Sequence, residues 1–379
     1  MSARDLITRP LAHDDSILAA IFIPSNEIHP SPLLVTAGHD DSIKIWEINE
    51  ISPTLTKPLF IVKHSSLSCT SLTSSITCQY QSQTTAAQSN SHSQSSQSLS
   101  LVWSSHLDGT IHSINVLTGE IVHTLFAGVG LTYSIVHHTN KNLLFTCSPD
   151  GSIHSLQTPD NSTINLDKIF ISQNQLNKQE LSKQSQSILE SHRIYSSNQV
   201  RTLNSNQLEK FITCIKMSYN GKYLITGQSN GKILLWKESE KADWECLGEF
   251  LGSHRGSVRC ATFSHDNKYL YSGGEDGTVL MWDLQTKLLL SLINTNNNNS
   301  WITAIIVNKQ QIINLNPSNS LLIISSLSKE ISIYDTIKKE FIQNLEKNKS
   351  SVWTMTNLNS LLAIGSEDGS LRLAHLPVT

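Results

Sequence analysis

Four short apolar segments follow one another between Gly252 and Leu292, and turn residues separate them. The segments SVRCATF, KYLYSG, TVLMWDL and LLLSL alternate or are continuously apolar over five to seven residues, which is typical of β-strands. Asp276-Gly277 lies between the second and third segments and favours a tight hairpin, because such pairs readily take positive φ angles. The pattern therefore predicts a unit of four short strands joined by turns.

The same pattern recurs along the chain. Full copies begin at Ala12, Phe211 and Ser351, and weaker copies contain LSLVWSSHLDGTIHSINV, NLLFTCSPDGSIHSLQT and LLIISSLSKEISIYDT. Two polar interruptions hold about 57 residues, so the seven copies average roughly 46 residues each, close to the ~40–45 residues of a four-stranded propeller blade. One such copy cannot bury its faces alone, so the copies must stack around an axis. We predict an all-β fold, a seven-bladed β-propeller.

The predicted propeller takes up the whole chain, residues 1–379, as one domain. The last copy ends after its third strand, at LRLAHLPVT, whereas a spare strand-like run precedes the first copy. We therefore expect residues 5–12 to supply the outer strand of the last blade and to close the ring. The blades are expected at about 13–62, 63–126, 127–204, 207–251, 252–294, 300–346 and 350–379.

Polar tracts interrupt two of the blades. Residues 80–98, between the first and second strands of blade 2, are predicted to be disordered because they contain few apolar residues. Residues 159–196 lie between the third and fourth strands of blade 3, and a short, weakly amphipathic helix is predicted over 177–192. Both connections belong to the bottom face of a propeller, whereas the short Asn-rich tract at 294–299 projects toward the top. We expect a partner on the less crowded top face.

The repeat resembles that of the WD-repeat family over nearly the whole chain, and Trp282-Asp283 is the dipeptide after which that family is named. The resemblance implies a hydrogen-bond chain of a His before the first strand, a Ser or Thr in the second, an Asp in the hairpin and a Trp in the third. Two copies carry the full set: His13, Thr36, Asp40 and Trp46 in blade 1, and His254, Ser272, Asp276 and Trp282 in blade 5. Such a set satisfies its own buried polar groups, so we interpret it as structural. A hydrolase triad uses similar residues, but it needs only one site.

The remaining copies keep only parts of this set. Blade 2 has His64 and Ser104 but Ile114 in place of the Trp, and blade 4 has Thr226 and Trp236 without the His. We expect these blades to rely on apolar packing instead.

One position at the start of each first strand is expected near the channel mouth on the top face. Aligning the copies assigns it to Leu18, Ser68, Tyr133, Thr213, Arg259, Thr303 and Trp353. Aromatic residues and Arg dominate binding hot spots, because they bury a large area at modest entropic cost. We therefore predict that a partner contacts Trp301 (two residues before Thr303), Trp353, Tyr133, Arg259 and Leu18. The alternative, in which the aromatics plug the channel or pack between blades, stays open.

Charge and motif content disfavour several classes of function. A net charge of −3 argues against sequence-independent nucleic-acid binding. We find no signal-peptide pattern and no apolar run long enough for a membrane helix, so we expect an intracellular protein without membrane insertion. The six cysteines form no CxxC pair and show no zinc-like spacing with His, so we expect reduced thiols and no metal. Because there is no GxGxxG or GxxxxGKS/T motif, we expect no cofactor and no enzyme activity.

Four segments carry a closer resemblance: AHDDSI at 12–17, EKFITCIKMSYNGKYLITG at 209–227, SWITA at 300–304 and SVWTM at 351–355. They resemble the small WD-repeat subunits of the Ski (superkiller) complex, whose relatives also join the Paf1 transcription-elongation complex in animals and plants. The resemblance implies a non-catalytic scaffold, monomeric within a hetero-complex. It would dock on a tetratricopeptide-repeat protein and, through it, on a DExH-box RNA helicase that feeds RNA to the exosome. It also implies a location in cytoplasm and nucleus, and no direct contact with nucleic acid.

Other classes of WD-repeat protein remain as alternatives. A substrate adaptor of a ubiquitin ligase usually carries a recruiting module outside the ring, and a G-protein β-type subunit has an N-terminal coiled-coil helix. Neither feature is visible in this sequence, so we expect a scaffold. A generic WD-repeat assembly platform is the broader alternative.

Overall fold

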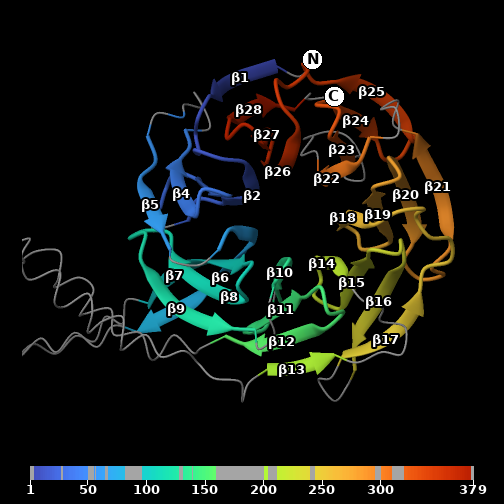
Figure 1. Cartoon of the computed structure of the whole chain (residues 1–379), viewed down its shortest axis with the longest axis horizontal. Coiled ribbons are helices and arrows are strands. Elements are labelled where there is room, and N and C mark those ends of the chain that lie inside the picture. Colours follow the sequence, from blue (N-terminus) through green and yellow to red (C-terminus); the bar gives the residue numbers. More distant parts are fainter. Residues whose placement is uncertain are drawn as a thin grey trace, which may run out of the picture.

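The computed structural model describes residues 4–26, 29–49, 55, 57–64, 67–81, 96–127, 131–138, 140–158, 200–203, 211–239, 244–294, 300–309 and 320–376. These residues form seven antiparallel sheets of four strands each, arranged as blades around a common axis (Figure 1). Every regular element in the described part of the chain is a β-strand. The innermost strands of neighbouring blades contact one another in a closed circle. The predicted all-β, seven-bladed propeller is confirmed.

Each of the first six blades contains four consecutive strands that follow one another outward from the axis. Blade 1 contains β2 (Ile17–Ile23), β3 (Leu33–Gly38), β4 (Ser42–Glu47) and β5 (Phe60–Lys63). Blade 2 contains β6 (Cys69–Gln81), β7 (Ser96–His106), β8 (Thr110–Asn115) and β9 (Ile121–Phe126). Blade 3 contains β10 (Ser134–His137), β11 (Leu143–Cys147), β12 (Ile153–Gln157) and β13 (Val200–Leu203).

The second half of the ring repeats this order. Blade 4 contains β14 (Ile212–Met217), β15 (Tyr223–Gln228), β16 (Ile233–Glu238) and β17 (Trp244–Glu249). Blade 5 contains β18 (Val258–Phe263), β19 (Tyr269–Gly274), β20 (Thr278–Asp283) and β21 (Leu289–Asn294). Blade 6 contains β22 (Ile302–Lys309), β23 (Ser320–Ser326), β24 (Ile331–Asp335) and β25 (Glu340–Asn344).

Blade 7 is built from strands of both ends of the described chain, which lie side by side in Figure 1. It contains β26 (Val352–Leu358), β27 (Leu361–Ser366) and β28 (Leu371–His375), and its outer strand is β1 (Arg4–Arg9). The predicted closure by an N-terminal strand is therefore confirmed, but the expected end of that strand at residue 12 is wrong. The strand ends at Arg9 because Pro10 has no N–H to donate and Leu11 takes a positive φ of 54°.

The core lies between neighbouring blades. Every position of β3 and β27 is buried, because adjacent blades cover both faces of these central strands. One apolar cluster that includes Leu34, Trp46, Leu361 and Leu371 joins blade 1 to blade 7 across the closure of the ring. The apolar runs that the sequence shows in the second and third strands therefore fill the spaces between blades.

The strands of blade 2 extend further than the sequence predicts. β6 reaches Gln81 and β7 begins at Ser96, and Tyr80 pairs with Gln97. Both ends of the predicted disordered tract, residues 80–98, are thus strand, because the two long neighbouring strands continue their ladder of backbone hydrogen bonds beyond the buried part of the blade. Residues 82–95 lie outside the described residues, as do 159–199 with their predicted helix, and 295–299.

Candidate protein-interaction face

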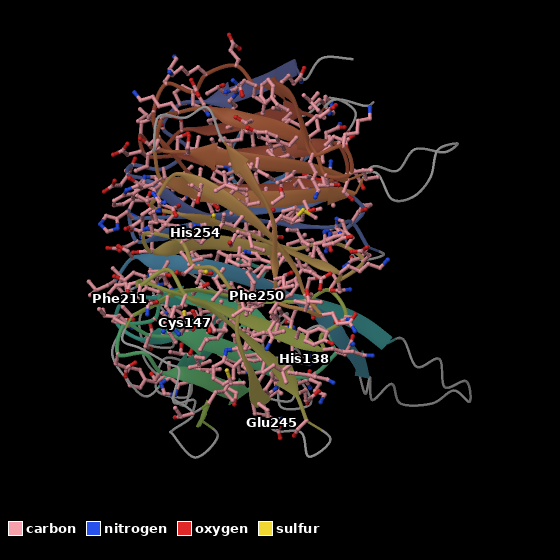
Figure 2. The ribbon with its side chains drawn as sticks, turned by 90° about the vertical axis from the view of Figure 1, so that its right-hand side faces the viewer. His138, Cys147, Phe211, Glu245, Phe250 and His254 are labelled. Atoms are coloured by element: carbon pink, nitrogen blue, oxygen red, sulfur yellow. The ribbon has the colours of Figure 1, made fainter. Side chains whose placement is uncertain are left out.

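The two faces of the ring differ in what they carry. We call the face at which the innermost strands begin the top face; the hairpins between second and third strands lie on the same side. The innermost strands end at the opposite, bottom face. Figure 2 views the ring edge-on and shows Phe211, which precedes β14, toward the left-hand face and His138, which follows β10, toward the right-hand face.

A β-bulge marks the start of the innermost strand in six blades. The strand register shifts by one residue at each bulge. The bulged residues are Leu18, Thr70, Thr213, Arg259, Thr303 and Trp353. In blade 3, Tyr133 occupies the corresponding place, and its N–H donates to the carbonyl oxygen of Cys147 at 3.1 Å. A bulge turns its side chain away from the regular pleat, so these residues form a ring at the top of the channel.

The position assigned to blade 2 from the sequence is wrong. The bulged residue is Thr70, whereas Ser68 lies two residues earlier and is buried, with its hydroxyl 2.7 Å from Nδ1 of His39. The misassignment has a physical origin in the segment that forms β6, CTSLTSSITCQYQ, whose many small polar residues leave little apolar alternation to define the register.

Two threonines of this ring connect blades. Thr70 Oγ1 donates to the carbonyl oxygen of Thr132 in blade 3 at 2.8 Å. Thr213 Oγ1 donates in the same way to the carbonyl oxygen of Val258 in blade 5. Because these hydroxyls bond within the ring, the threonines contribute to its rigidity more than to contact with a partner.

Arg259, Trp301 and Glu275 form a composite surface element across blades 5 and 6. The guanidinium carbon of Arg259 lies 4.7 Å from the ring centroid of Trp301, within the range of a cation–π interaction. Arg259 Nη2 also lies 2.7 Å from Oε1 of Glu275. Trp301 keeps 37% of its surface exposed. The stacked pair is therefore both held in place and accessible from the top face.

Tyr133 lies against a second aromatic residue that the sequence analysis missed. Its ring centroid is 5.2 Å from that of Phe211, and both side chains are half-buried. Tyr133 also packs against the apolar cluster between blades 3 and 4, so packing between blades accounts for part of its surface. Phe211 directly precedes β14 as Trp301 precedes β22, and this shared position is the signal that could have identified it.

Leu18 and Trp353 belong to the two blades that meet at the closure of the ring. They are the bulged residues of β2 and β26, whose strands are in contact, and both side chains are half-buried. The structure therefore places four of the residues named as partner contacts in the ring at the top of the channel: Leu18, Tyr133, Arg259 and Trp353. The fifth, Trp301, directly precedes β22 and stacks on Arg259.

The structure brings the four residues of each full set together. In blade 1, Trp46 Nε1 donates to Thr36 Oγ1 at 2.9 Å, and Thr36 Oγ1 lies 2.8 Å from His13 Nε2. Since an indole N–H can only donate, the hydroxyl proton of Thr36 is left for His13 Nε2, and the Nδ1–H of His13 donates to Asp40 at 2.9 Å. Blade 5 repeats this chain with Trp282, Ser272, His254 and Asp276 at 2.9, 2.8 and 3.1 Å.

Burial and hydrogen bonding set the charges within the blade 1 set. Burial lowers the pKa of His13 in spite of its bond to Asp40, so the ring stays neutral at pH 7. Burial alone would raise the pKa of Asp40, but hydrogen bonds from His13, Ser42 and the backbone N–H of Asp14 outweigh it and lower this pKa well below its usual value. The hydroxyl of Thr36 is completely buried, so no substrate reaches it. The hydrogen bonds of this set join the second strand, the hairpin and the third strand of the blade to the loop that carries His13.

Blade 2 differs from the interpretation of its sequence. The hydroxyl of Ser104 lies 2.9 Å from Nε2 of His106, so His106 at the end of β7 takes the place that we expected for His64. The rings of His64, His106 and His112 instead form a cluster, with centroid distances of 4.2 Å between His64 and His106 and 4.8 Å between His106 and His112.

Two further observations concern metals and membranes. In the part of the chain that the structure describes, no three His, Cys, Asp or Glu side chains are arranged to hold a metal ion. Across the same residues, no helix has the length and apolar character needed to cross a bilayer.

Comparison with known families gives one match. The model of the family described as "WD domain, G-beta repeat" matches residues 5–47, 197–237 and 244–283. Each matched range joins an outer strand to the first three strands of the next blade, and together they cover blades 1, 4 and 5. Among the described residues, these three blades are the ones in which a Trp N–H donates to the hydroxyl of the second strand. No curated protein matches the chain.

Proposed function

We propose that this chain, a seven-bladed propeller built from WD40 repeats, is a non-catalytic scaffold that binds other proteins through its top face. The observation that carries the proposal is the stacked pair of Arg259 and Trp301, which is ordered by contacts within the ring and still exposed. Preorganised aromatic and Arg side chains lose little conformational freedom on binding, so they form effective anchors.

We further propose that the assembly is a Ski-like complex that supports exosome-mediated RNA decay, with a companion role in Paf1-linked transcription elongation. The support is that two of the four resembling segments, SVWTM and SWITA, contain Trp353, which lies in the top-face ring, and Trp301, which stacks on Arg259 of that ring. In this proposal the direct partner is a tetratricopeptide-repeat protein, and a DExH-box RNA helicase joins through it. The proposed location is cytoplasm and nucleus.

The test is affinity purification of the tagged protein from its own cells at moderate salt, followed by mass spectrometry. We expect a DExH-box helicase and a long tetratricopeptide-repeat protein to be recovered in stoichiometric amounts. Recovery of a cullin-type ligase would contradict the Ski-like assembly and would favour a substrate adaptor.

A pair of double variants tests the face itself. Trp301→Ala with Trp353→Ala removes two large side chains from the top face. Ile337→Ala with Phe341→Ala removes comparable side chains that are 52% and 48% exposed on the outer part of blade 6. We expect the first double variant to lose the partners and the second to retain them, with both proteins folded by circular dichroism. Equal recovery with both would rule out the top face.

A further inference from the structure

Six leucines with exposed side chains lie on the outer rim of blades 4 and 5. Each of them keeps between 41% and 62% of its surface exposed. They are Leu247 in β17, Leu251 after it, Leu288 before β21, and Leu289, Leu290 and Leu292 in β21. Single exposed apolar residues are normal on a monomer, whereas a contiguous group of them marks an interaction surface. We call these six residues the leucine rim.

Backbone contacts join the two blades within the leucine rim. Leu251 and Leu288 form a parallel bridge, in which the N–H of Leu251 donates to the carbonyl oxygen of Lys287 at 3.0 Å. The ammonium group of Lys287 donates to the carbonyl oxygen of Leu247 at 2.6 Å. The leucines of blade 4 therefore lie directly beside the start of β21, and the rim is one continuous surface.

The leucines of β21 extend this surface along the strand. Leu289 is paired with Trp282 of β20, and Leu292 is paired with Leu280. Trp282 and Leu280 both belong to the apolar cluster between blades 4 and 5. Because residues paired across two strands point to the same face of a sheet, Leu289 and Leu292 face blade 4, where Leu247 and Leu251 lie.

The outer edge of β21 is open to a further strand. In the described part of the chain β21 pairs only with β20 and is the last strand of its sheet, at the right-hand rim of the ring in Figure 1. Its outward N–H and C=O groups can therefore bond to another strand. The sequence of β21, LLSLIN, contains no charged residue and no proline, which are the residues that usually protect an exposed edge.

The other outer strands of the ring differ from β21. Each of β1, β5, β13, β17 and β25 contains at least one charged residue. The remaining outer strand, β9, has no Asp, Glu, Lys or Arg, but Phe126 at its end is its one exposed side chain. Among the outer strands that the structure describes, β21 alone combines an uncharged edge with several exposed apolar side chains.

An uncharged edge of this kind suits a second copy of the same strand. Two strands related by a two-fold axis run antiparallel and present the same residues to one another. A charged side chain near the axis would face its own charge, and like charges directly opposite each other destabilise a strand pair. Pairing of β21 with itself is free of that repulsion, and the leucine rim adds apolar surface next to the paired strands.

We propose that two copies of this chain form a dimer in which the outer edges of their β21 strands pair about a two-fold axis and each copy covers the leucine rim of the other. A two-fold interface uses the edge of each copy once, so assembly stops at the dimer. Such a dimer differs from the monomeric state that the sequence resemblance implies. It leaves the top face of each copy free, so it adds to the proposed function without depending on it.

The first test is the mass of the full chain in solution, measured by sedimentation velocity from below one micromolar to tens of micromolar. We expect a reversible equilibrium between monomer and dimer in this range. Leu292→Lys places a charge on the open edge and is expected to weaken dimerisation by about tenfold or more. Ile61→Lys makes the same kind of change at a side chain that is 55% exposed in the outer strand β5 and is expected to dimerise like the wild type.

Hydrogen exchange of the backbone amides locates the contact. The outward N–H groups of β21 gain hydrogen bonds in the dimer, so we expect the exchange of β21 to slow as the fraction of dimer rises. The exchange of β5 is expected to stay the same at every concentration. Circular dichroism of the two lysine variants establishes that both are folded.

Four results would overturn the proposal. A wild-type chain that stays monomeric over the whole range would leave the leucine rim to a different protein. Equal dimerisation of Leu292→Lys and Ile61→Lys, or a dimer in which β21 exchanges as fast as in the monomer, would place the contact elsewhere. Growth beyond the dimer would exclude a closed two-fold interface. None of these measurements involves a top-face partner, so the proposed function is tested separately.

Discussion

The backbone N–H of His13 donates a hydrogen bond of 3.0 Å to the carbonyl oxygen of Gly369. This bond joins the first residue of the blade 1 hydrogen-bond chain to the hairpin of blade 7, at the closure of the ring. His254 and Gly231 make the same contact between blades 5 and 4, at 3.1 Å. In both places the hairpin of one blade packs directly on the loop that carries the histidine of the next, so the set within a blade also holds neighbouring blades in position.

Gly369→Ala is expected to weaken the closure of the ring. A Cβ at Gly369 would lie 2.3 Å from the carbonyl oxygen of His13, and the residue has a positive φ of 73°. We expect a loss of about 2–4 kcal/mol of unfolding free energy, since strain and a backbone clash add together. Gly252→Ala is the control, because Gly252 also has a positive φ but its nearest neighbour would be 3.8 Å away. Similar urea midpoints for the two variants would argue against the clash.

Ser272→Ala is expected to destabilise blade 5. The change removes the hydroxyl that accepts from Trp282 Nε1 and bonds His254 Nε2, so two completely or nearly buried polar atoms lose their partner. Leaving buried polar groups unsatisfied costs about 1–3 kcal/mol each, so we expect a loss of roughly 2–4 kcal/mol. The control is Ser291→Ala, which removes a half-buried hydroxyl outside this set in the same blade. Thermal unfolding followed by circular dichroism measures both, and a Ser272→Ala midpoint equal to that of the control would contradict the prediction.

The histidine cluster of blade 2 is expected to make stability depend on pH. Burial lowers the pKa of His112 to about 4 and that of His106 to about 2, and the neighbouring imidazoles add to the effect. Because these folded-state values lie below the unfolded value, the unfolded chain binds more protons in acid. The stabilisation is thus complete above pH 6.5 and is lost as the pH falls from there toward 4.

The size of this effect follows from the linkage between protonation and folding. Each of the two histidines should remove about 2 kcal/mol between pH 7.5 and 5. In His112→Gln the group no longer titrates, so the difference between urea stabilities at these two pH values should shrink by about that amount. An unchanged pH dependence in His112→Gln would show that His112 does not stay neutral in the folded protein.

Arg259→Ala is expected to reduce partner binding without unfolding the protein. The change removes the cation that stacks on Trp301 and pairs with Glu275, and both of these side chains lie at the surface. We expect a 10–100-fold loss of affinity for the purified partner, corresponding to about 1.4–2.8 kcal/mol, and little change in thermal midpoint. Arg255→Ala makes the same charge change at an exposed residue of the same blade and serves as the control. Equal affinities of the two variants would remove Arg259 from the interface.

The sequence repeats predict the architecture because each blade has the same pattern of four short strands joined by turns. Asp-Gly pairs at the hairpin, such as Asp276-Gly277, and apolar runs, such as β19, recur in several blades. Because one blade cannot bury its faces alone, this recurrence predicts a ring of blades. The errors occur where the pattern is weakest. In β6 the small polar residues leave the register undefined in the sequence, so the channel-mouth position of blade 2 is predicted at Ser68, whereas the structure places it at Thr70.

Local sequence thus determined the blade count, the closure by an N-terminal strand and the residues of the two complete hydrogen-bond sets. The reason is that strand alternation, turn residues and the spacing of the residues in each hydrogen-bond set are properties of each repeat. Tertiary structure alone decided that Arg259 stacks on Trp301 and that His106 replaces His64 beside Ser104. These relationships join residues from different strands or blades. Their distances depend on how the sheets pack around the axis, and that packing is a property of the closed ring as a whole.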